Sequence, residues 1–209
     1  MAMPLVNQPV SELLAAIRSA SPTPGGGSAA ALAGAIGASL LAMVANLPTK
    51  TAATEEDAQR LRSAADRCTA LALDLERLVD VDSAAYELVM AAYKRPKVTD
   101  DDKAARTAAI QAAFREATAA PLAVMRAAAA AAEQGSVIGR FGNPSAASDL
   151  EVGVELLNAA LRGARLNVEI NLRSMKDAAY VETIQQDVTE FARAIAHETA
   201  AARDALNRR

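Results

Sequence analysis

Apolar residues recur along this chain with the three- and four-residue spacing of helices, and few stretches alternate with the period of two that is typical of strands. The pattern therefore predicts an all-α protein. We expect one helical domain over residues 1–209, built as a multi-helix bundle of long antiparallel helices around a central helix rich in Ala and Gly. The individual helices are predicted over residues 9–19, 28–47, 54–94, 100–120, 121–134, 148–174 and 178–206, with a loop over 135–145.

Local signals mark where several of these helices begin and end. Thr54 precedes Asp57 by three residues, and Thr99 precedes Asp102 by three residues, as in capping boxes. Asp177 is expected to cap the last helix. Pro121 is predicted either to kink the helix around it or to start a new one.

The segment from Gly25 to Leu47 contains no charged residue and is about long enough to span a bilayer. Ala, Gly and Ser dominate it, however, and only its second half carries larger apolar residues. A central helix buried on all sides in a bundle fits this composition better than a membrane span. We therefore expect no membrane association.

Composition narrows the classes of function. Apolar residues make up 52% of the chain but aromatic residues only 3%, so the core must be built from small and aliphatic side chains on closely packed helices. The net charge is −3 with both signs mixed, and without a basic block nucleic acid is not an expected partner. One Cys and one His exclude a disulfide framework and a multi-histidine or multi-cysteine metal site. Met1–Asn7 has no leader-like pattern, which predicts a cytoplasmic protein.

The stretch Pro22–Ser28 reads PTPGGGS and leads straight into the central helix. The unpaired N–H groups at a helix start suit an anion or a polar substrate group, and glycines let such a group approach closely. Taken alone, a plain tight loop explains the three glycines more simply. His197 falls beside the apolar seam of the last helix and is interpreted as solvated.

A carboxylate interrupts the apolar pattern of the long helix. Cys68, Leu75, Asp82 and Val89 share one row at sevenfold spacing, so Asp82 stands where an apolar residue is expected. Such a carboxylate is costly unless it is paired or hydrogen-bonded. Two interpretations are open: a functional carboxylate, or a local rotation that brings Asp82 into solvent.

Tyrosines and amides accompany that carboxylate. Tyr86 lies one turn after Asp82, and Tyr93 follows two turns later. Asn167 and Asn171 lie one turn apart on a face of small residues, where they either bind a planar polar ligand or bridge two helices. Taken alone, bridging is the favoured interpretation.

Together these pieces come in a distinctive order that covers nearly the whole chain. The series resembles the cyclodeaminase/cyclohydrolase family, which comprises the cyclodeaminase domain of formiminotransferase-cyclodeaminase and the stand-alone methenyltetrahydrofolate cyclohydrolases. The blocks that carry the resemblance are Pro22–Gly27, Met43–Leu47, Asp82 with Ala85-Tyr86, Val89-Met90 with Ala92-Tyr93, Pro96–Asp100, Lys103–Arg106 with Ile110-Gln111, Gly142-Asn143, Ser148-Asp149, Asn167-Val168 and Asn171.

The resemblance implies an all-helical homodimer that acts on the one-carbon unit of tetrahydrofolate without a metal or redox cofactor. It predicts hydrolysis of 5,10-methenyltetrahydrofolate to 10-formyltetrahydrofolate. One alternative is the cyclodeaminase reaction, which closes 5-formiminotetrahydrofolate and releases ammonia. The other is a non-catalytic helical dimer that binds folate or a partner helix.

The resemblance also assigns roles to residues. The predicted catalytic residues are Asp82, as the base, with Tyr86 and Asn167. The predicted substrate-binding residues are Thr23, Gly25, Gly26, Gly27, Asn46, Tyr93, Lys94, Lys97, Asn143, Ser148, Asp149 and Asn171, of which the two lysines would meet the glutamate tail. After Asn46-Leu47 many family members carry Thr, Gly and a basic pair, but this chain reads Pro48-Thr49-Lys50. That departure predicts either a monoglutamylated folate or a different substrate.

Overall fold

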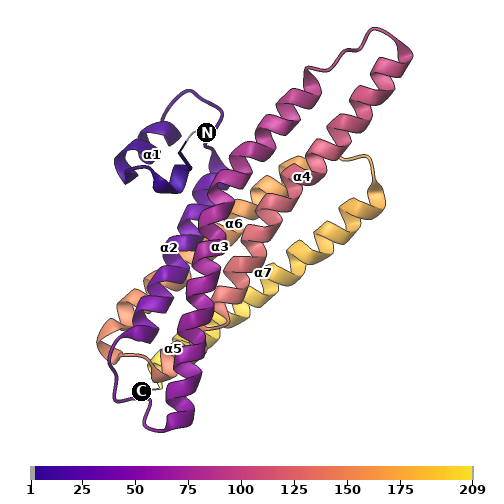
Figure 1. The fold of residues 1–209 in the computed structure, drawn as a ribbon. Helices are drawn as coiled ribbons and strands as arrows, with labels where there is room; N and C mark the ends of the chain where they lie inside the picture. Colours follow the sequence, from indigo (N-terminus) through magenta and orange to yellow (C-terminus); the bar gives the residue numbers. More distant parts are fainter. Residues whose placement is uncertain (1–2, 209) are drawn as a thin grey trace.

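The computed structural model describes residues 3–208 and folds them into helices joined by short turns, with no strand among them (Figure 1). The all-α prediction is confirmed. In chain order the elements are η1 (Leu5–Asn7), α1 (Val10–Ile17), α2 (Gly26–Asn46), α3 (Glu55–Tyr93), α4 (Asp100–Ala132), α5 (Gly135–Phe141), η2 (Pro144–Ala146), α6 (Ala147–Leu172) and α7 (Ala178–Asn207).

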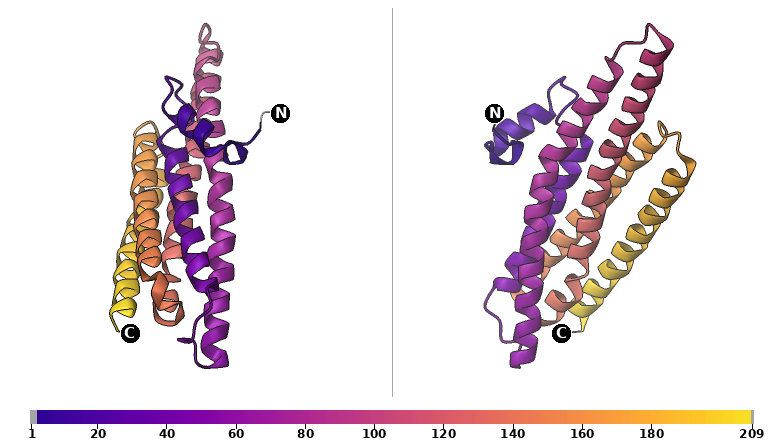
Figure 2. Two further views of the ribbon diagram at one scale, coloured as in Figure 1. Left: turned by 90° about the vertical axis from the view of Figure 1, so that its left-hand side faces the viewer. Right: turned by 45° about the vertical axis from the view of Figure 1, so that its right-hand side comes forward.

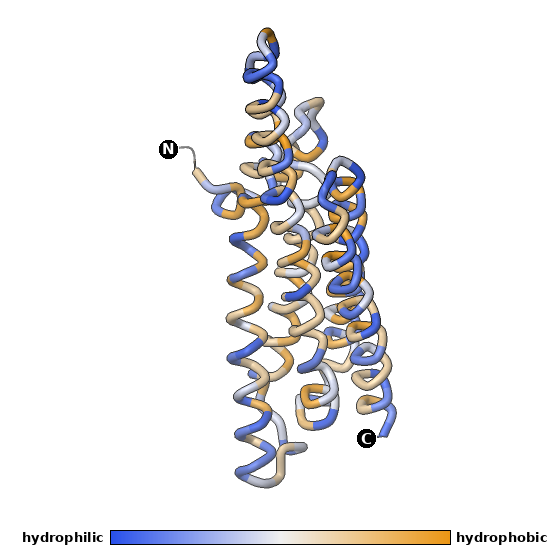
Figure 3. The backbone as a smooth tube through the Cα atoms, turned by 90° about the vertical axis from the view of Figure 1, so that its right-hand side faces the viewer, coloured by the Kyte–Doolittle hydropathy of each residue, from blue (hydrophilic) through white to orange (hydrophobic). Residues whose placement is uncertain are grey.

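Four long helices form the body of the molecule. α2 packs against α3 and α6, and α4 closes the ring by packing against both of those helices (Figures 1 and 2). Neighbours in the ring run antiparallel, as predicted, while α7 lies outside against α4 and α5. On several of the helices hydrophilic and hydrophobic residues recur within each turn, which is the pattern of helices with one buried face (Figure 3).

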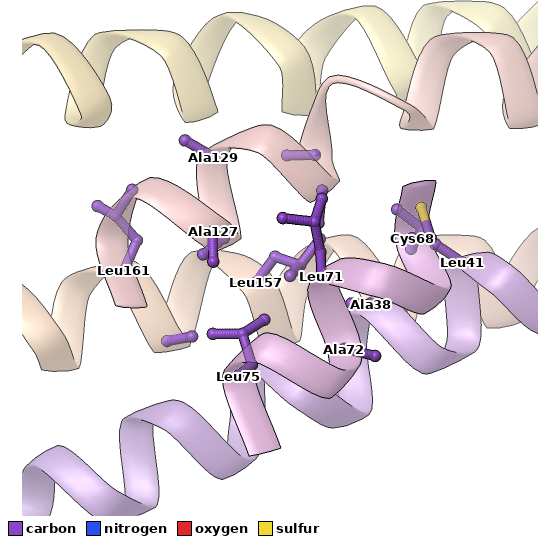
Figure 4. Packing of buried hydrophobic residues seen from close by; sticks show 14 of the residues in the cluster. Ala38, Leu41, Cys68, Leu71, Ala72, Leu75, Ala127, Ala129, Leu157 and Leu161 are labelled. Atoms are coloured by element: carbon purple, nitrogen blue, oxygen red, sulfur yellow. The ribbon is translucent and has the colours of Figure 1, made fainter. Parts of the chain in front are cut away.

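The core at the centre of the ring consists mainly of Ala and aliphatic side chains (Figure 4). Leu41, Leu75 and Leu157 meet there from α2, α3 and α6, and each has 0% of its surface exposed. Small residues let the helices approach this closely: a Cβ atom on Gly37 would lie 2.7 Å from the Gly153 carbonyl oxygen. The scarcity of aromatic residues thus matches a core of tightly packed helices.

The uncharged helix α2 is long and apolar enough to cross a membrane, yet 61% of its most apolar window is buried inside the bundle. This burial is what a core helix of a folded bundle shows. One side of the helix stays open, where Ile36 and Met43 are exposed.

The α3–α4 hairpin extends past the amino end of α2 (Figure 2). It has a small core of its own, made by Ala85, Val89, Ala92, Ala113, Phe114 and Ala117. Tyr93 packs edge-on against Phe114, with ring centres 6.2 Å apart, and the Arg106 guanidinium lies 5.6 Å above the Tyr93 ring. The hairpin is therefore an ordered projection over this end of the bundle.

The predicted helix caps are confirmed. The Asp57 amide donates to Thr54 Oγ1 at 3.1 Å, Thr99 and Asp102 form a reciprocal capping box, and Asp177 accepts from the Tyr180 amide. Each cap depends only on residues close in sequence, which is why the pattern alone located them.

Three boundaries differ from the sequence predictions. α2 begins at Gly26 rather than Ser28, so two of the three glycines belong to its first turn and Gly25 is its N-cap. Residues 135–145 are largely helical rather than a loop, forming α5 and part of η2, because Ile138 and Phe141 are buried in the core. α4 runs without a break through Pro121, which is buried.

Helix α4 continues through Pro121 because a side chain replaces the backbone hydrogen bond that proline cannot make. Proline lacks an N–H group, so the carbonyl of Ala117, four residues earlier, has no backbone donor within the helix. The Asn171 side chain supplies that donor from α6, with Nδ2 at 2.6 Å from the Ala117 oxygen. A side chain 54 residues away in sequence thus completes the helix.

Candidate active site at the amino end of α2

Asp82 lies directly against the first turn of α2. Its Oδ1 atom is 2.0 Å from the position that a Cβ atom on Gly27 would take. The absence of a side chain at position 27 is therefore what lets the carboxylate reach the backbone of this turn. The interpretation in which Asp82 rotates into solvent is not what the fold shows, since the residue is only partly exposed.

Ser28 holds the other oxygen of this carboxylate. Its hydroxyl lies 3.2 Å from Asp82 Oδ2 and 2.8 Å from the Val79 carbonyl oxygen, and the Ser83 hydroxyl is 3.2 Å away. Only 1% of the Ser28 surface is exposed. Asp82 is thus anchored between two helices by a buried polar contact.

Burial raises the pKa of Asp82 above its ordinary range, while hydrogen bonds from the hydroxyl and backbone amide of Ser28 pull it part of the way back. The positive end of the α2 dipole also favours the ionised form. A partly buried carboxylate with a raised pKa is suited to accept a proton during a reaction near neutral pH.

Other predicted residues meet Asp82 at this end of the bundle. Asn167 on α6 approaches Gly26, with Nδ2 3.8 Å from where a Cβ atom on Gly26 would lie, and donates to the Gly163 carbonyl at 2.9 Å. Tyr86 lies one turn beyond Asp82 and is exposed. Gly25 is the N-cap of α2.

An open cleft adjoins this group of residues. It has a volume of about 790 Å³ and is lined by Thr23 and Pro24, by Ser83 and Glu87, and by the amino-terminal segment. The Leu5 amide donates to Asp80 Oδ1 at 2.8 Å and fixes that segment against α3. The cleft is large enough for a small organic substrate. Ser83, whose hydroxyl contacts that of Ser28, lines it, while Asp82 itself is not one of its lining residues.

Tyr93, Lys94 and Lys97 lie farther out, on the projecting α3–α4 hairpin. Eleven residues of helix separate Tyr93 from Asp82, about 16 Å along α3. Both lysines are exposed. They lie beyond the site rather than inside it.

A second group of predicted residues lies at the opposite end of α2. Asn46 ends that helix, and Ser148 and Asp149 begin α6 beside it. Asn143 is engaged in the turn before α6, where Nδ2 donates to the Pro48 carbonyl at 2.7 Å and Oδ1 accepts from the Ser145 amide at 2.9 Å. The length of α2, about 30 Å, separates this group from Asp82 within one chain.

Asn171 contacts protein rather than an open site, because its amide nitrogen is bonded to Ala117 as described above. The bridging interpretation of this residue is what the structure shows. Ser28 and Ser83 were not among the predicted site residues. The signal for Ser28 was its place directly after the third glycine, in the first turn of an otherwise uncharged helix.

Among residues 3–208 no group of three or more His, Cys, Asp or Glu side chains is arranged to hold a metal ion. His197 is exposed and lies beside Glu198, outside this site, as its interpretation as a solvated residue predicted.

Comparison with known proteins agrees with this fold. The sequence profile of the formiminotransferase-cyclodeaminase family matches residues 9–190. The chain therefore belongs to that family. It is 38% identical over 176 residues to a methenyltetrahydrofolate cyclohydrolase of Methylorubrum extorquens, an alignment that covers 84% of this chain and 85% of the relative.

Two further relatives share the family. The formimidoyltransferase-cyclodeaminase of Sus scrofa is 32% identical over 205 residues, which cover 98% of this chain but 38% of that longer protein. A crystal structure of formiminotetrahydrofolate cyclodeaminase from Thermotoga maritima superposes with a TM-score of 0.85 at 26% identity, covering 96% of both chains.

Proposed function

We propose that this protein is a folate one-carbon enzyme that hydrolyses 5,10-methenyltetrahydrofolate to 10-formyltetrahydrofolate. The observation that carries the proposal is the Asp82 carboxylate seated against the glycine turn of α2 and hydrogen-bonded to Ser28, whose neighbour Ser83 lines an open cleft. The cyclohydrolase from Methylorubrum extorquens supports it, because that relative matches this chain over nearly its full length.

The proposed chemistry follows from the substrate and the site. The methenyl carbon belongs to an amidinium-like cation and is already electrophilic, so a positioned water and a base suffice to attack it. Asp82 takes the proton of that water as the new carbon–oxygen bond forms. Asp82 then passes this proton to N5 as the carbon–N5 bond breaks. The hydroxyl of the adduct loses its own proton, so the one-carbon unit remains on N10 as a formyl group with net release of one proton.

The neighbouring residues have positioning roles in this scheme. The negative charge of Asp82 attracts the substrate cation, while the Asn167 amide and the Tyr86 hydroxyl orient the ring system. The Ser28 amide is bonded to Asp82, which leaves the N–H groups of Gly26 and Gly27 in this turn to face the emerging formyl oxygen. We propose that no metal or redox cofactor takes part, and overnight dialysis against EDTA is expected to leave the rate unchanged.

Loss of the methenyl absorbance with purified protein tests the proposal directly. Asp82→Asn is expected to lower kcat by about 10²–10⁴-fold, the usual contribution of a general base. Asp74→Asn is the matched control, because Asp74 is an exposed carboxylate on the same helix, paired with Arg77. Hydrolysis no faster than the buffer background, or an Asp82→Asn variant as fast as the unchanged protein, would contradict the proposal.

The cyclodeaminase reaction is the second candidate, favoured by the close likeness to the Thermotoga maritima structure of that name. With 5-formiminotetrahydrofolate as substrate, this reaction makes methenyl absorbance rise and releases ammonia. Running both substrates side by side separates the two activities, since the absorbance changes in opposite directions. If neither substrate turns over and folate still binds saturably, a non-catalytic binding protein is the result.

We also propose that the protein forms a homodimer through the open side of α2 and α6. Exposed apolar side chains line this side, namely Ile36 and Met43 on α2 and Val152, Leu166 and Ile170 on α6. Leu40 Cβ lies 3.2 Å from where a Cβ atom on Gly153 would be, which places the two rows next to each other. Helix α1 projects from the same side of the bundle (Figure 2).

A two-fold axis across this antiparallel pair would bring the amino end of α2 in one chain toward the carboxyl end of α2 in the other. The second group of predicted residues, around Asn46 and Asn143, would then approach the partner's site. Light scattering is expected to give twice the mass of one chain. Ile36→Glu is expected to give a monomer, while Val98→Glu, at an exposed apolar residue before α4, leaves the dimer intact.

A further inference from the structure

We infer that Ser28 is a positioning residue whose hydroxyl changes partner with the proton on Asp82, donating to the carboxylate when it is ionised and accepting from it when it is protonated. The inference rests on the proposed role of Asp82 as the base. It adds to the site a residue that the family resemblance did not assign, and it gives that residue a defined task in moving the proton.

The geometry gives the Ser28 hydroxyl more acceptors than it has protons. Its oxygen lies 2.8 Å from the Val79 carbonyl oxygen and 3.2 Å from Asp82 Oδ2. A hydroxyl has one hydrogen and two lone pairs, so it donates to only one of these groups at a time. When Asp82 is ionised, the charge-assisted bond to Oδ2 is the stronger choice.

Protonation reverses this arrangement. A protonated Asp82 carries an O–H group that donates to Ser28 Oγ, and the Ser28 hydrogen then turns to the Val79 carbonyl. The Ser83 hydroxyl, 3.2 Å from Ser28, supplies a donor in the ionised state and so keeps the oxygen satisfied. Because Ser28 is 1% exposed, solvent does not replace these contacts.

Few charged side chains lie near the hydrogen bonds between Asp82, Ser28 and Ser83. Arg77, Asp80 and Glu87 line the cleft beside Ser83, and the Asp80 carboxylate is bonded to the Leu5 amide. Helix α2 carries no charged residue, and α6 presents the neutral amide of Asn167. Ser28 hydrogen-bonds directly to the Asp82 carboxylate and can respond to the proton on Asp82 by rotating a single bond.

Carbon-13 NMR of aspartate carboxyls measures this without any turnover. The Asp82 signal is assigned by its loss in Asp82→Asn, and its titration is followed in Ser28→Ala. Removal of the hydroxyl is expected to move the Asp82 pKa upward, because a hydrogen bond to the charged form is lost. Ser39→Ala is the matched control: it removes a hydroxyl from the same helix that bonds only to the Ala35 carbonyl, and no shift is expected.

Two further variants complete the test. Ser83→Ala is expected to shift the titration in the same direction by less, and it decides the question if Ser28→Ala fails to fold. Ser28→Thr keeps the hydroxyl and is expected to restore the original titration. The inference is overturned if Asp82 titrates in Ser28→Ala as it does in the unchanged protein. If only Ser83→Ala folds, an unchanged Asp82 titration in that variant overturns it.

Kinetics then link the network to turnover. In Ser28→Ala the acid limb of the kcat profile is expected to move to higher pH, and kcat below that limb to fall about tenfold with KM within about twofold. An unmoved acid limb contradicts the role in catalysis. If the unchanged protein shows no hydrolysis at all, the proposed function fails, while the NMR titration still decides whether Ser28 responds to Asp82.

Discussion

The Asp82 carboxylate occupies the space that a side chain at position 27 would need: its Oδ1 atom lies 2.0 Å from where a Cβ atom on Gly27 would be. No side chain at position 27 is compatible with the observed position of this carboxylate. The glycine is therefore needed for the geometry of the site rather than for an unusual backbone, since no glycine among residues 3–208 has a positive φ. A substitution at position 27 therefore tests the position of the carboxylate without changing Asp82 itself.

Gly27→Ala is expected to abolish most turnover while leaving the fold intact. The new methyl group displaces the Asp82 carboxylate, a short side chain that can rotate away, so kcat should fall by at least about 100-fold, as for loss of a general base. Alanine favours a helix over glycine by about 1 kcal/mol, which offsets the local crowding. Thermal unfolding and methenyl hydrolysis measured on the same sample check this.

Gly26→Ala is the matched control for stability in that experiment. A Cβ atom there would meet only Asn167, at an ordinary contact distance of 3.8 Å. Its melting temperature should equal or exceed that of the unchanged protein. If Gly27→Ala hydrolyses substrate at the original rate, the position of Asp82 is not required for the reaction.

Asp82→Asn is expected to stabilise the protein at neutral pH. Burial raises the pKa of Asp82 in the folded state above its value in the unfolded chain. For such a group, stability is greatest below the unfolded pKa and declines as pH rises through the folded pKa. At pH 7 the ionised carboxylate thus destabilises the fold, and the neutral amide removes that cost.

The higher stability expected for Asp82→Asn at pH 7 should disappear as the pH is lowered. Melting temperatures of both proteins, measured in steps from pH 7 to about pH 4, are expected to converge as Asp82 becomes protonated in the folded state. A variant that melts lower than the unchanged protein at pH 7 would show that the contacts of the ionised carboxylate outweigh its burial.

Asn171 and Pro121 are expected to be energetically coupled. Asn171→Ala leaves the Ala117 carbonyl without a donor and should cost about 1–3 kcal/mol of unfolding free energy. In a Pro121→Ala background the restored backbone N–H can bond to that carbonyl, so the same asparagine substitution should cost less. Urea unfolding of the two single variants and the double variant gives the coupling energy. Additive effects would show that Asn171 acts elsewhere.

Cys68 is expected to be inert in the folded protein. It is fully buried in the core, and burial raises the pKa of its thiol to about 12. At pH 8 the reactive thiolate is therefore scarce as well as inaccessible. A disulfide reagent should label none of this cysteine in native buffer within minutes and one thiol per chain in denaturant. Rapid native labelling would indicate that the bundle opens locally.

Local patterns in the sequence determined the helical class, most helix boundaries and the caps. Thr54, Thr99 and Asp177 bond to atoms three residues away, so the residues that cap the start of each helix are recognisable from the local sequence. The uncharged, Ala- and Gly-rich composition of residues 25–47 likewise marked α2 as a core helix. The place of Asp82 in an apolar row marked that residue as unusual.

Tertiary contacts decided the rest. The continuity of α4 through Pro121 depends on Asn171, and α5 forms because its apolar residues reach the core. The pairing of Asp82 with Gly27 and Ser28 joins residues 54 positions apart in the case of Ser28. Helix periodicity gives the face of each residue but not which end of the bundle it meets. The family resemblance placed Asn46 and Asn143 in one site with Asp82, although the length of α2 separates them within one chain.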